Sequence, residues 1–311
     1  MLNSHPPADA PDAAPVWIDL FEPTPEEIAR MAADFGIAVP SRASLEEIET
    51  SSRLRAEGEV LYVSMPLGVH AVGLAALPLG FILSPKLLVT VRFSQMQAFE
   101  AVEARARRGH CSSSATTFAV ILDAMVDYAA DVLEKLGHDL ATVSTHTFGA
   151  DGGQAQHTAP GARALRRSLS AVGIAGDQLS RLRQSLLGMQ RIIGFVLDTA
   201  QWLAPELKPR LASARQDLGS LVDFESHLSG KTQFLLDAIL GFINTEQNDI
   251  FRVLTIVSVV GIPPTLIASW YGMNFHGMPE YGWRYGYPYV IGLMALSVLL
   301  PVIWFKRRGW W

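Results

Sequence analysis

The chain has 311 residues, of which 49% are hydrophobic, and its 25 basic and 30 acidic side chains give a formal net charge of −5. A length of this order predicts roughly two domains, and the apolar content is ample for a core. The negative charge argues against nucleic acid as a partner. The single cysteine, Cys111, excludes an intrachain disulfide and fits a reducing compartment.

The first part of the chain predicts a disordered tail followed by a small α/β domain. Residues 1–15 are rich in Pro and Ala and lack the basic and apolar regions of a secretory signal. Val16–Leu20 predicts a strand, and Thr24–Glu27 predicts a helix start with a capping box. Ser44 and Glu47 predict a second capped helix. Further strands are expected at 60–65, 81–83 and 87–92, within a cytoplasmic α/β domain that spans residues 16–110.

The middle of the chain, residues 111–208, predicts a cytoplasmic helical region. One helix is expected over 114–147, before the glycine-rich stretch 149–153. Beyond it, apolar residues recur mostly at steps of three and four, which is typical of helices that pack against others. These residues are Leu165, Leu169, Val172, Leu179, Leu182, Leu186 and Met189. We interpret this stripe as core rather than as a binding site.

A final long helix is predicted to begin near Pro209 and to meet no strong breaker before Pro263-Pro264. If it continues to Ser269, it has about 61 residues and a length on the order of 90 Å. Its first part, residues 209–249, is expected to be a cytoplasmic stalk that runs into the membrane.

Two apolar segments predict membrane helices. Residues 250–271 contain one charged side chain, Arg252, and are long enough to cross a hydrocarbon layer of roughly 30 Å. Residues 287–305 contain no charged side chain. The alternative is a pair of buried core helices in a soluble protein.

The basic residues after the second segment predict the topology. The tail, residues 306–311, begins with Lys306-Arg307-Arg308, which places the C-terminus in the cytoplasm by the positive-inside rule. Two crossings then place the N-terminus in the cytoplasm too and leave residues 272–286 as a short outer loop. Aromatic residues cluster at the segment ends, as expected at a bilayer interface: Trp270, Tyr271, Tyr287, Tyr289, Trp304, Trp310 and Trp311. The predicted location is the cytoplasmic (inner) membrane, with the lipid bilayer as a partner.

Enzyme motifs are incomplete. Gly230-Lys231-Thr232 resembles the end of a phosphate-binding loop, but Glu225 stands where its first glycine belongs. The eight histidines form no His-Glu-x-x-His pair, and one cysteine excludes a thiolate zinc cluster. We therefore predict no enzymatic activity and no cofactor.

A polar stripe follows one side of the first membrane segment. Steps of about 3.6 residues from Asn248 pass Thr255, Val259 and Ile262 and end beside Asn274. Asp237 lies three turns before Asn248 on the same face. Two helices per chain cannot enclose a channel, so a pore would need several copies with this stripe inward. The alternative is that Asn248 and Thr255 merely hydrogen-bond a neighbouring helix.

The outer end of this stripe favours a hydrated divalent cation. Mg²⁺ gives up its water reluctantly and prefers oxygen ligands. A ring of Asn274 amide oxygens and Gly272 carbonyls can accept hydrogen bonds from the hydration shell, whereas a carboxylate ring could hold the ion too tightly. Val259 and Ile262 predict a constriction that closes by dewetting. An inside-negative potential of 100 mV lowers the free energy of an entering divalent ion by 2 × 2.3, or roughly 4.6 kcal/mol, so uptake needs no ATP.

Four sequence elements, in order, resemble the CorA family of magnesium and cobalt channels. They are Tyr271–Phe275, which contains the Gly-Met-Asn motif, Met278–Glu280, Tyr285–Pro288 and Phe305–Arg308. The resemblance implies an α+β membrane protein: a funnel-shaped homopentamer with a cytoplasmic α/β domain, a long helical stalk and two membrane helices, the first lining the pore.

The resemblance also implies roles for individual residues. Gly272, Met273 and Asn274 would form the selectivity site, and Glu280 in the outer loop would attract cations. Positions that would face the pore are Asp237, Asn248, Thr255 and Ile262. Family members commonly close when Mg²⁺ binds acidic residues between cytoplasmic domains. Asp217 and Asp223 are the candidates for such a regulatory site here, because the expected sensor position falls near Ser213.

Three functions remain open at this point. The first is uptake of Mg²⁺, with Co²⁺, Ni²⁺ and Zn²⁺ unranked, driven by membrane potential. The second is a ZntB-type zinc transporter that couples to protons, although such proteins usually lack the pattern at Met278–Glu280. The third is a membrane-anchored cytoplasmic sensor without transport, which leaves the stripe up to Asn274 unexplained.

Overall fold

A computed structural model of the protein describes residues 2–5, 14–47, 49, 53–68, 77–106, 112–149, 161–273 and 282–310. The chain forms two compact units. Unit 1 comprises Met1–Gln156 and Arg166–Leu236, and unit 2 comprises His157–Leu165 and Asp237–Trp311. One helix, α7 (Leu207–Tyr271), contributes to both units, and its 65 residues confirm the predicted long helix.

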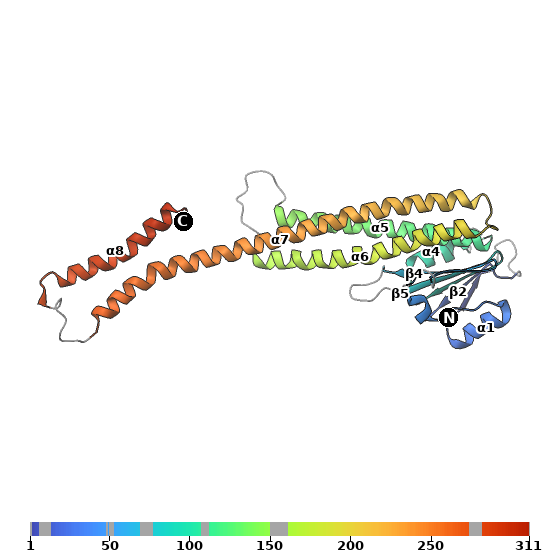
Figure 1. Ribbon diagram of the computed structural model, residues 1–311, viewed down its shortest axis with the longest axis horizontal. Helices are drawn as coiled ribbons and strands as arrows, with labels where there is room; N and C mark the ends of the chain where they lie inside the picture. Colours follow the sequence, from blue (N-terminus) through green and yellow to red (C-terminus); the bar gives the residue numbers. More distant parts are fainter. Residues whose placement is uncertain are drawn as a thin grey trace. The chain divides into compact units, whose positions relative to one another are not determined.

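Unit 1 contains a six-stranded sheet with strand order β1-β2-β6-β5-β4-β3 (Figure 1). The strands are β1 (Leu2–His5), β2 (Trp17–Phe21), β3 (Leu54–Glu57), β4 (Val60–Leu67), β5 (Leu77–Leu83) and β6 (Leu88–Arg92). Only β2 and β6 pair in parallel, and the other neighbours are antiparallel. The sequence predicted β2, β4, β5 and β6, while the two edge strands were missed.

The predicted disordered tail is wrong for Leu2–His5, which form the edge strand β1. Main-chain pairing with β2 satisfies their backbone groups, from Leu2 opposite Leu20 to His5 opposite Trp17. The His5 ring also stacks on Trp17, with ring centroids 4.4 Å apart. These contacts order a segment whose composition alone does not predict a strand.

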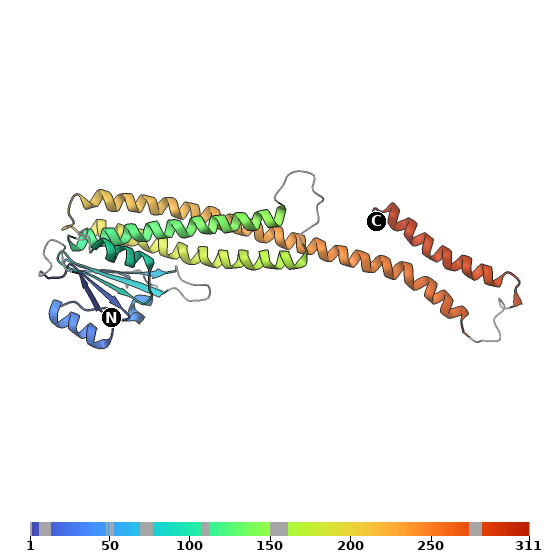
Figure 2. The same cartoon turned by 180° about the vertical axis from the view of Figure 1, so that it is seen from behind.

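Two short helices cover one face of the sheet (Figures 1 and 2). Helix α1 (Pro25–Phe35) has the predicted capping box, in which the Thr24 side chain accepts from the Glu27 amide and the Glu27 side chain accepts from the Thr24 amide. Helix α2 (Arg42–Glu46) is capped by Ser41, whose hydroxyl accepts from the Ser44 amide at 3.2 Å. The predicted cap at Ser44 is therefore wrong, because the helix begins one turn earlier.

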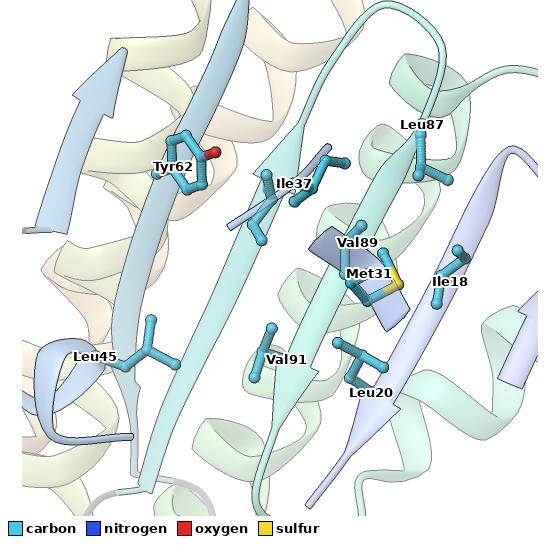
Figure 3. Packing of buried hydrophobic residues seen from close by; sticks show 10 residues of the cluster. Ile18, Leu20, Met31, Ile37, Leu45, Tyr62, Leu87, Val89 and Val91 are labelled. Atoms are coloured by element: carbon cyan, nitrogen blue, oxygen red, sulfur yellow. The ribbon is translucent and has the colours of Figure 1, made fainter. Parts of the chain in front are cut away.

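Alternate residues of the strands form a hydrophobic cluster under these helices (Figure 3). Ile18, Leu20, Val89 and Val91 surround Met31 of α1. All are nearly or fully buried. Each Å² of apolar surface that they remove from water contributes about 25 cal/mol to the stability of this layer.

Three helices cover the opposite face, the short α4 (Gln97–Ala106) and the long α5 (Ser114–Phe148) and α6 (Ala162–Thr199). Phe81 of β5 meets Phe118 of α5 edge to face, with centroids 5.5 Å apart. Gly188 lets α6 approach β4 closely, because a Cβ there would stand 2.8 Å from the Cβ of Met65. The predicted stripe on α6 is buried at Leu165, Val172, Leu179, Leu182, Leu186 and Met189, which confirms its interpretation as core.

Helices α5, α6 and the first part of α7 lie side by side in both views (Figures 1 and 2). Buried Glu225 of α7 accepts from Arg183 of α6 at 2.6 Å and from Ser229 at 2.7 Å. Arg210 of α7 donates to Asp123 of α5. Such paired carboxylates fix the register of the helices, since either partner left alone would lose its hydrogen bonds.

A buried ion pair ties β2 to β6. Asp19, which is 0% exposed, accepts from Thr90 at 2.6 Å and from Arg92 Nε and Nη2 at 2.9 and 2.8 Å. The Arg92 guanidinium also lies over the rings of Phe21 and Phe99, at 4.9 and 5.1 Å from their centroids. The guanidinium of Arg92 has thus lost most of its water, and its charge is compensated by the Asp19 carboxylate.

Asp19→Ala is therefore expected to destabilise unit 1 by about 3–5 kcal/mol, because it leaves the charge of Arg92 buried and unpaired. In the full-length protein this should lower the midpoint of thermal unfolding by roughly 10 °C. The exposed Asp34 of α1 supplies the control, and Asp34→Ala should leave the midpoint unchanged. Equal midpoints for the two variants would contradict a stabilising role for the pair.

Candidate functional site

Two helices of unit 2 are long and apolar enough to cross a membrane: α7, through its C-terminal part, and α8 (Gly286–Arg307). Within the most apolar stretch of each helix, the share of residues buried inside the protein is 0% in α7 and 6% in α8. The alternative of core helices in a soluble protein requires these side chains to be covered by the rest of the chain. They are exposed instead, so lipid or other copies of the chain must cover them.

Helix α8 runs antiparallel to the end of α7. At one end of the pair, the Arg252 guanidinium of α7 lies 6.0 Å from the ring centroid of Trp310, which stacks in turn on Phe305. At the other end, Gly272 and Trp283 line one hollow. Arg252 therefore lies at the same end of the pair as Lys306–Arg308. Sequence reasoning missed this contact, although Arg252 is the only charge in its segment.

The predicted pore stripe lies on one exposed side of α7. Asn248, Thr255, Val259 and Ile262 are all exposed, with exposed fractions of 42% at Val259 and 59% at Ile262. The Thr255 hydroxyl donates to the Phe251 carbonyl of its own helix at 2.7 Å. The alternative in which Thr255 donates to a neighbouring helix is therefore not seen within this chain, and the hydroxyl oxygen keeps its capacity to accept.

Two adjacent prolines interrupt the backbone hydrogen bonding beside this stripe. Pro263 and Pro264 have no N–H, so the carbonyls of Val259 and Val260 lack their usual helical donors. The hydroxyl of Thr265, the residue after Pro264, donates to the carbonyls of Gly261 and Ile262 at 3.2 and 2.8 Å. The aliphatic part of the stripe thus carries backbone oxygens that can accept hydrogen bonds from water.

The predicted selectivity site lies only partly within the described residues. The Gly272 amide donates to the Ala268 carbonyl at 2.9 Å, and the Met273 amide donates to that of Trp270 at 3.4 Å. These bonds close the last turn of α7 and fix where the chain leaves the helix. Asn274 and Glu280 lie outside the described residues.

A hollow of about 450 Å³ adjoins Gly272 at this end of the helix pair. Its wall includes Tyr271, Trp283 and Tyr287, together with the Arg284 side chain. Tyr271 and Tyr287 are among the aromatic residues predicted at a bilayer interface.

The acidic candidates are spread along α7. Asp217 and Asp223 are exposed on its unit 1 part, and Asp237 is exposed where unit 2 begins. Within the described ranges, no three His, Cys, Asp or Glu side chains gather where they could hold a metal ion.

Comparisons with known proteins identify the family of this chain. The sequence profile of the CorA-like Mg²⁺ transporter protein family matches residues 12–307. The magnesium transport protein CorA of Pasteurella multocida is 33% identical over 302 residues, which cover 95% of this chain and 92% of the relative. Its counterpart in Sodalis glossinidius is 32% identical over 300 residues, with the same coverage of 95% and 92%.

A solved structure shares the fold. The complete CorA magnesium transporter from Methanocaldococcus jannaschii superposes with a TM-score of 0.71 and 20% sequence identity, covering 95% of this chain and 91% of that one. The family match extends over strands β2 to β6 and over both α7 and α8. The chain therefore belongs to the CorA-like Mg²⁺ transporter protein family.

Proposed function

We propose that this protein carries divalent cations, Mg²⁺ above all, across a membrane through a pore built from several copies of the chain. The observation that carries the proposal is the pair of apolar helices left uncovered in a chain of this family. Like the family, the protein is a transporter and not an enzyme.

The pore is formed by α7 in a funnel-shaped homopentamer. Two helices per chain cannot enclose a channel, so the exposed stripe of α7 faces an axis shared by the copies. Asn248, Thr255, Val259 and Ile262 then line the pore, and Asp237 forms an acidic ring near its inner mouth. Helix α8 lies outside α7 and faces the lipid.

The protein lies in the cytoplasmic membrane with both termini in the cytoplasm. This orientation rests on the positive-inside rule, since Arg252 and Lys306–Arg308 lie at one end of the helix pair. The other end, with Gly272, Met273, Asn274 and Glu280, then faces outward, where cations enter.

Ion selection takes place at the ring of Gly272, Met273 and Asn274. Backbone and amide oxygens accept hydrogen bonds from a hydrated Mg²⁺ and let it leave again, which a ring of carboxylates would hinder. Mg²⁺ also regulates the pore by binding Asp217 and Asp223 between copies of unit 1. This arrangement fits their exposure on α7.

Ion flux into proteoliposomes tests the proposal. With the full-length protein and a potassium diffusion potential, Mg²⁺ uptake should rise as the inside becomes more negative, because roughly 4.6 kcal/mol at 100 mV acts on a divalent ion. A pH gradient alone should drive no uptake. Zn²⁺ flux that follows the pH gradient and ignores voltage would favour the zinc transporter, and absence of any flux would favour the sensor.

A further inference from the structure

The α/β domain of unit 1 contains a hollow, lined by both polar and apolar residues, that the transport function does not use. It has a volume of about 350 Å³ and lies on the face of the sheet covered by α2, beside the edge strand β3. Sites for small molecules have volumes of about 300–1,000 Å³, so this hollow is large enough for a small ligand. The residues that matter for its chemistry are Arg53, Arg55, Ser64, Ser44, Glu47 and Leu45.

Strand register creates the hollow. Ser64 of β4 stands opposite Gly80 of β5, which places two of the smallest residues side by side on this face. Leu45 of α2 covers Gly80 so closely that a Cβ there would lie 2.9 Å from its Cδ2. The small side chains at these two positions leave room for the hollow.

The Ser64 hydroxyl is buried in the wall of this hollow without a partner. Ser64 is 5% exposed, and its Oγ has no hydrogen-bond partner among the described residues. A buried hydroxyl that has lost its water carries a desolvation cost unless another group replaces that hydrogen bond. Because water does not reach the hydroxyl oxygen in this structure, a ligand oxygen replaces that bond only when the neighbouring side chains shift to uncover it.

The hollow next to Ser64 is also lined by arginines. Arg53 and Arg55 line the hollow, and Arg53 also lines a smaller adjoining one with Arg191 of α6 and Ser64. Burial and the nearby charge of Arg191 lower the pKa of Arg53, yet arginine stays protonated at any pH the protein meets.

Carboxylates compensate these charges only in part. Among the described residues, neither Arg53 nor Arg191 forms an ion pair, and the Arg53 Nε donates to the Glu47 carbonyl at 2.5 Å. Arg55 lies over the Tyr62 ring at 4.6 Å and pairs with Glu57 at 3.2 Å. Clustered positive charges without matching carboxylates favour an anion between them.

We propose that this hollow binds a small organic phosphate of the nucleotide class. The phosphate lies between Arg53 and Arg55 and accepts a hydrogen bond from Ser64, because planar guanidinium forks match the oxygens of a phosphate. The apolar part of the ligand contacts Val39, Pro40 and Leu45 on the α2 side. The site is separate from the pore, so it depends on nothing in the proposed transport.

Equilibrium dialysis of the full-length protein in lipid nanodiscs against labelled ATP tests this site. EDTA is present throughout, so that no metal ion in the pore can recruit the nucleotide. The parent protein should retain ATP at concentrations of about 1 mM or below, an affinity typical of weak specific ligands. Arg53→Gln and Arg55→Gln should each weaken binding about tenfold, since each removes a charge-assisted hydrogen bond.

Ser64→Ala separates binding from folding. Because the hydroxyl has no partner in the described part of the chain, the variant should unfold at the same temperature as the parent or higher. Its affinity for ATP should nevertheless fall at least about tenfold, because the lost hydrogen bond is made to a charged phosphate oxygen. A fall in stability together with binding would assign the hydroxyl a structural role and overturn the proposal.

Arg30→Gln is the matched control, because it removes the same charge from an exposed position on α1. Its affinity should stay within about twofold of the parent, as expected for a change that leaves the contacts of the site intact. The proposal is overturned if the parent retains no ATP, or if Arg30→Gln weakens binding as much as Arg53→Gln. Displacement of ATP by an equal concentration of inorganic phosphate would overturn the assignment to an organic phosphate. All of these readouts are obtained without ion flux, so they stand or fall separately from transport.

Discussion

Asn274→Ala is expected to abolish Mg²⁺ uptake while the protein still assembles in the membrane. Each copy loses an amide oxygen that accepts hydrogen bonds from the hydrated ion, worth about 1 kcal/mol each. The loss is repeated around the ring, so the barrier to entry rises by several times that amount. Growth of a magnesium-auxotrophic cell on low Mg²⁺, together with isotope uptake, measures the effect.

Asn274→Asp is the informative companion to this variant. It keeps an oxygen at the same position but adds a ring of negative charge, so the ion should bind more tightly and pass more slowly. Size-exclusion chromatography in detergent checks that both variants assemble like the parent. Unchanged uptake by the alanine variant would remove Asn274 from the pore.

Ile262→Gly is expected to let ions leak through the closed protein. The exposed Ile262 side chain belongs to the aliphatic part of the stripe, where a ring of such side chains excludes water when the pore is narrow. Glycine removes the whole side chain and lets water fill the constriction. Single-channel or proteoliposome conductance at high internal Mg²⁺, where the pore should be shut, should rise at least about tenfold, because rewetting removes the barrier.

The control for this variant is Ile291→Gly on α8, which makes the same replacement at another exposed apolar position. Both changes weaken a helix by about 1 kcal/mol, the usual difference between glycine and a better helix former. Only the change at Ile262 should raise the conductance. An equal leak in both variants would indicate general loosening of the helices instead of a gate.

The helices could be predicted from sequence because their signals are local. Arg252 is the only charge between residues 250 and 271, and the apolar stripe from Leu165 to Met189 follows the helical period. The edge strand Leu54–Glu57 has no such signal, since its side chains are half-buried or exposed and it is held by main-chain pairing with β4. Ser41 and Ser44 are equally good caps in sequence, and the structure selects Ser41.

The candidate site was predictable up to the level of one helix. Periodicity places Asn248, Thr255 and Ile262 on one side of α7, and the structure leaves all three exposed. Which of them faces a pore depends on how copies of the chain pack together, and neither the sequence nor the exposure of one chain carries that information. The hollow beside Ser64 is the opposite case, because Ser64 and Gly80 become neighbours only once β4 and β5 are in register.

Pro263 and Pro264 have a consequence for genetics. The carbonyl oxygens that they leave without a helical donor, at Val259 and Val260, belong to the main chain. Every amino acid placed at those two positions keeps the same oxygen, so no substitution at Val259 or Val260 itself can remove it. The oxygen of Val259 is instead controlled from four residues away, where any residue other than proline at position 263 would supply the missing N–H.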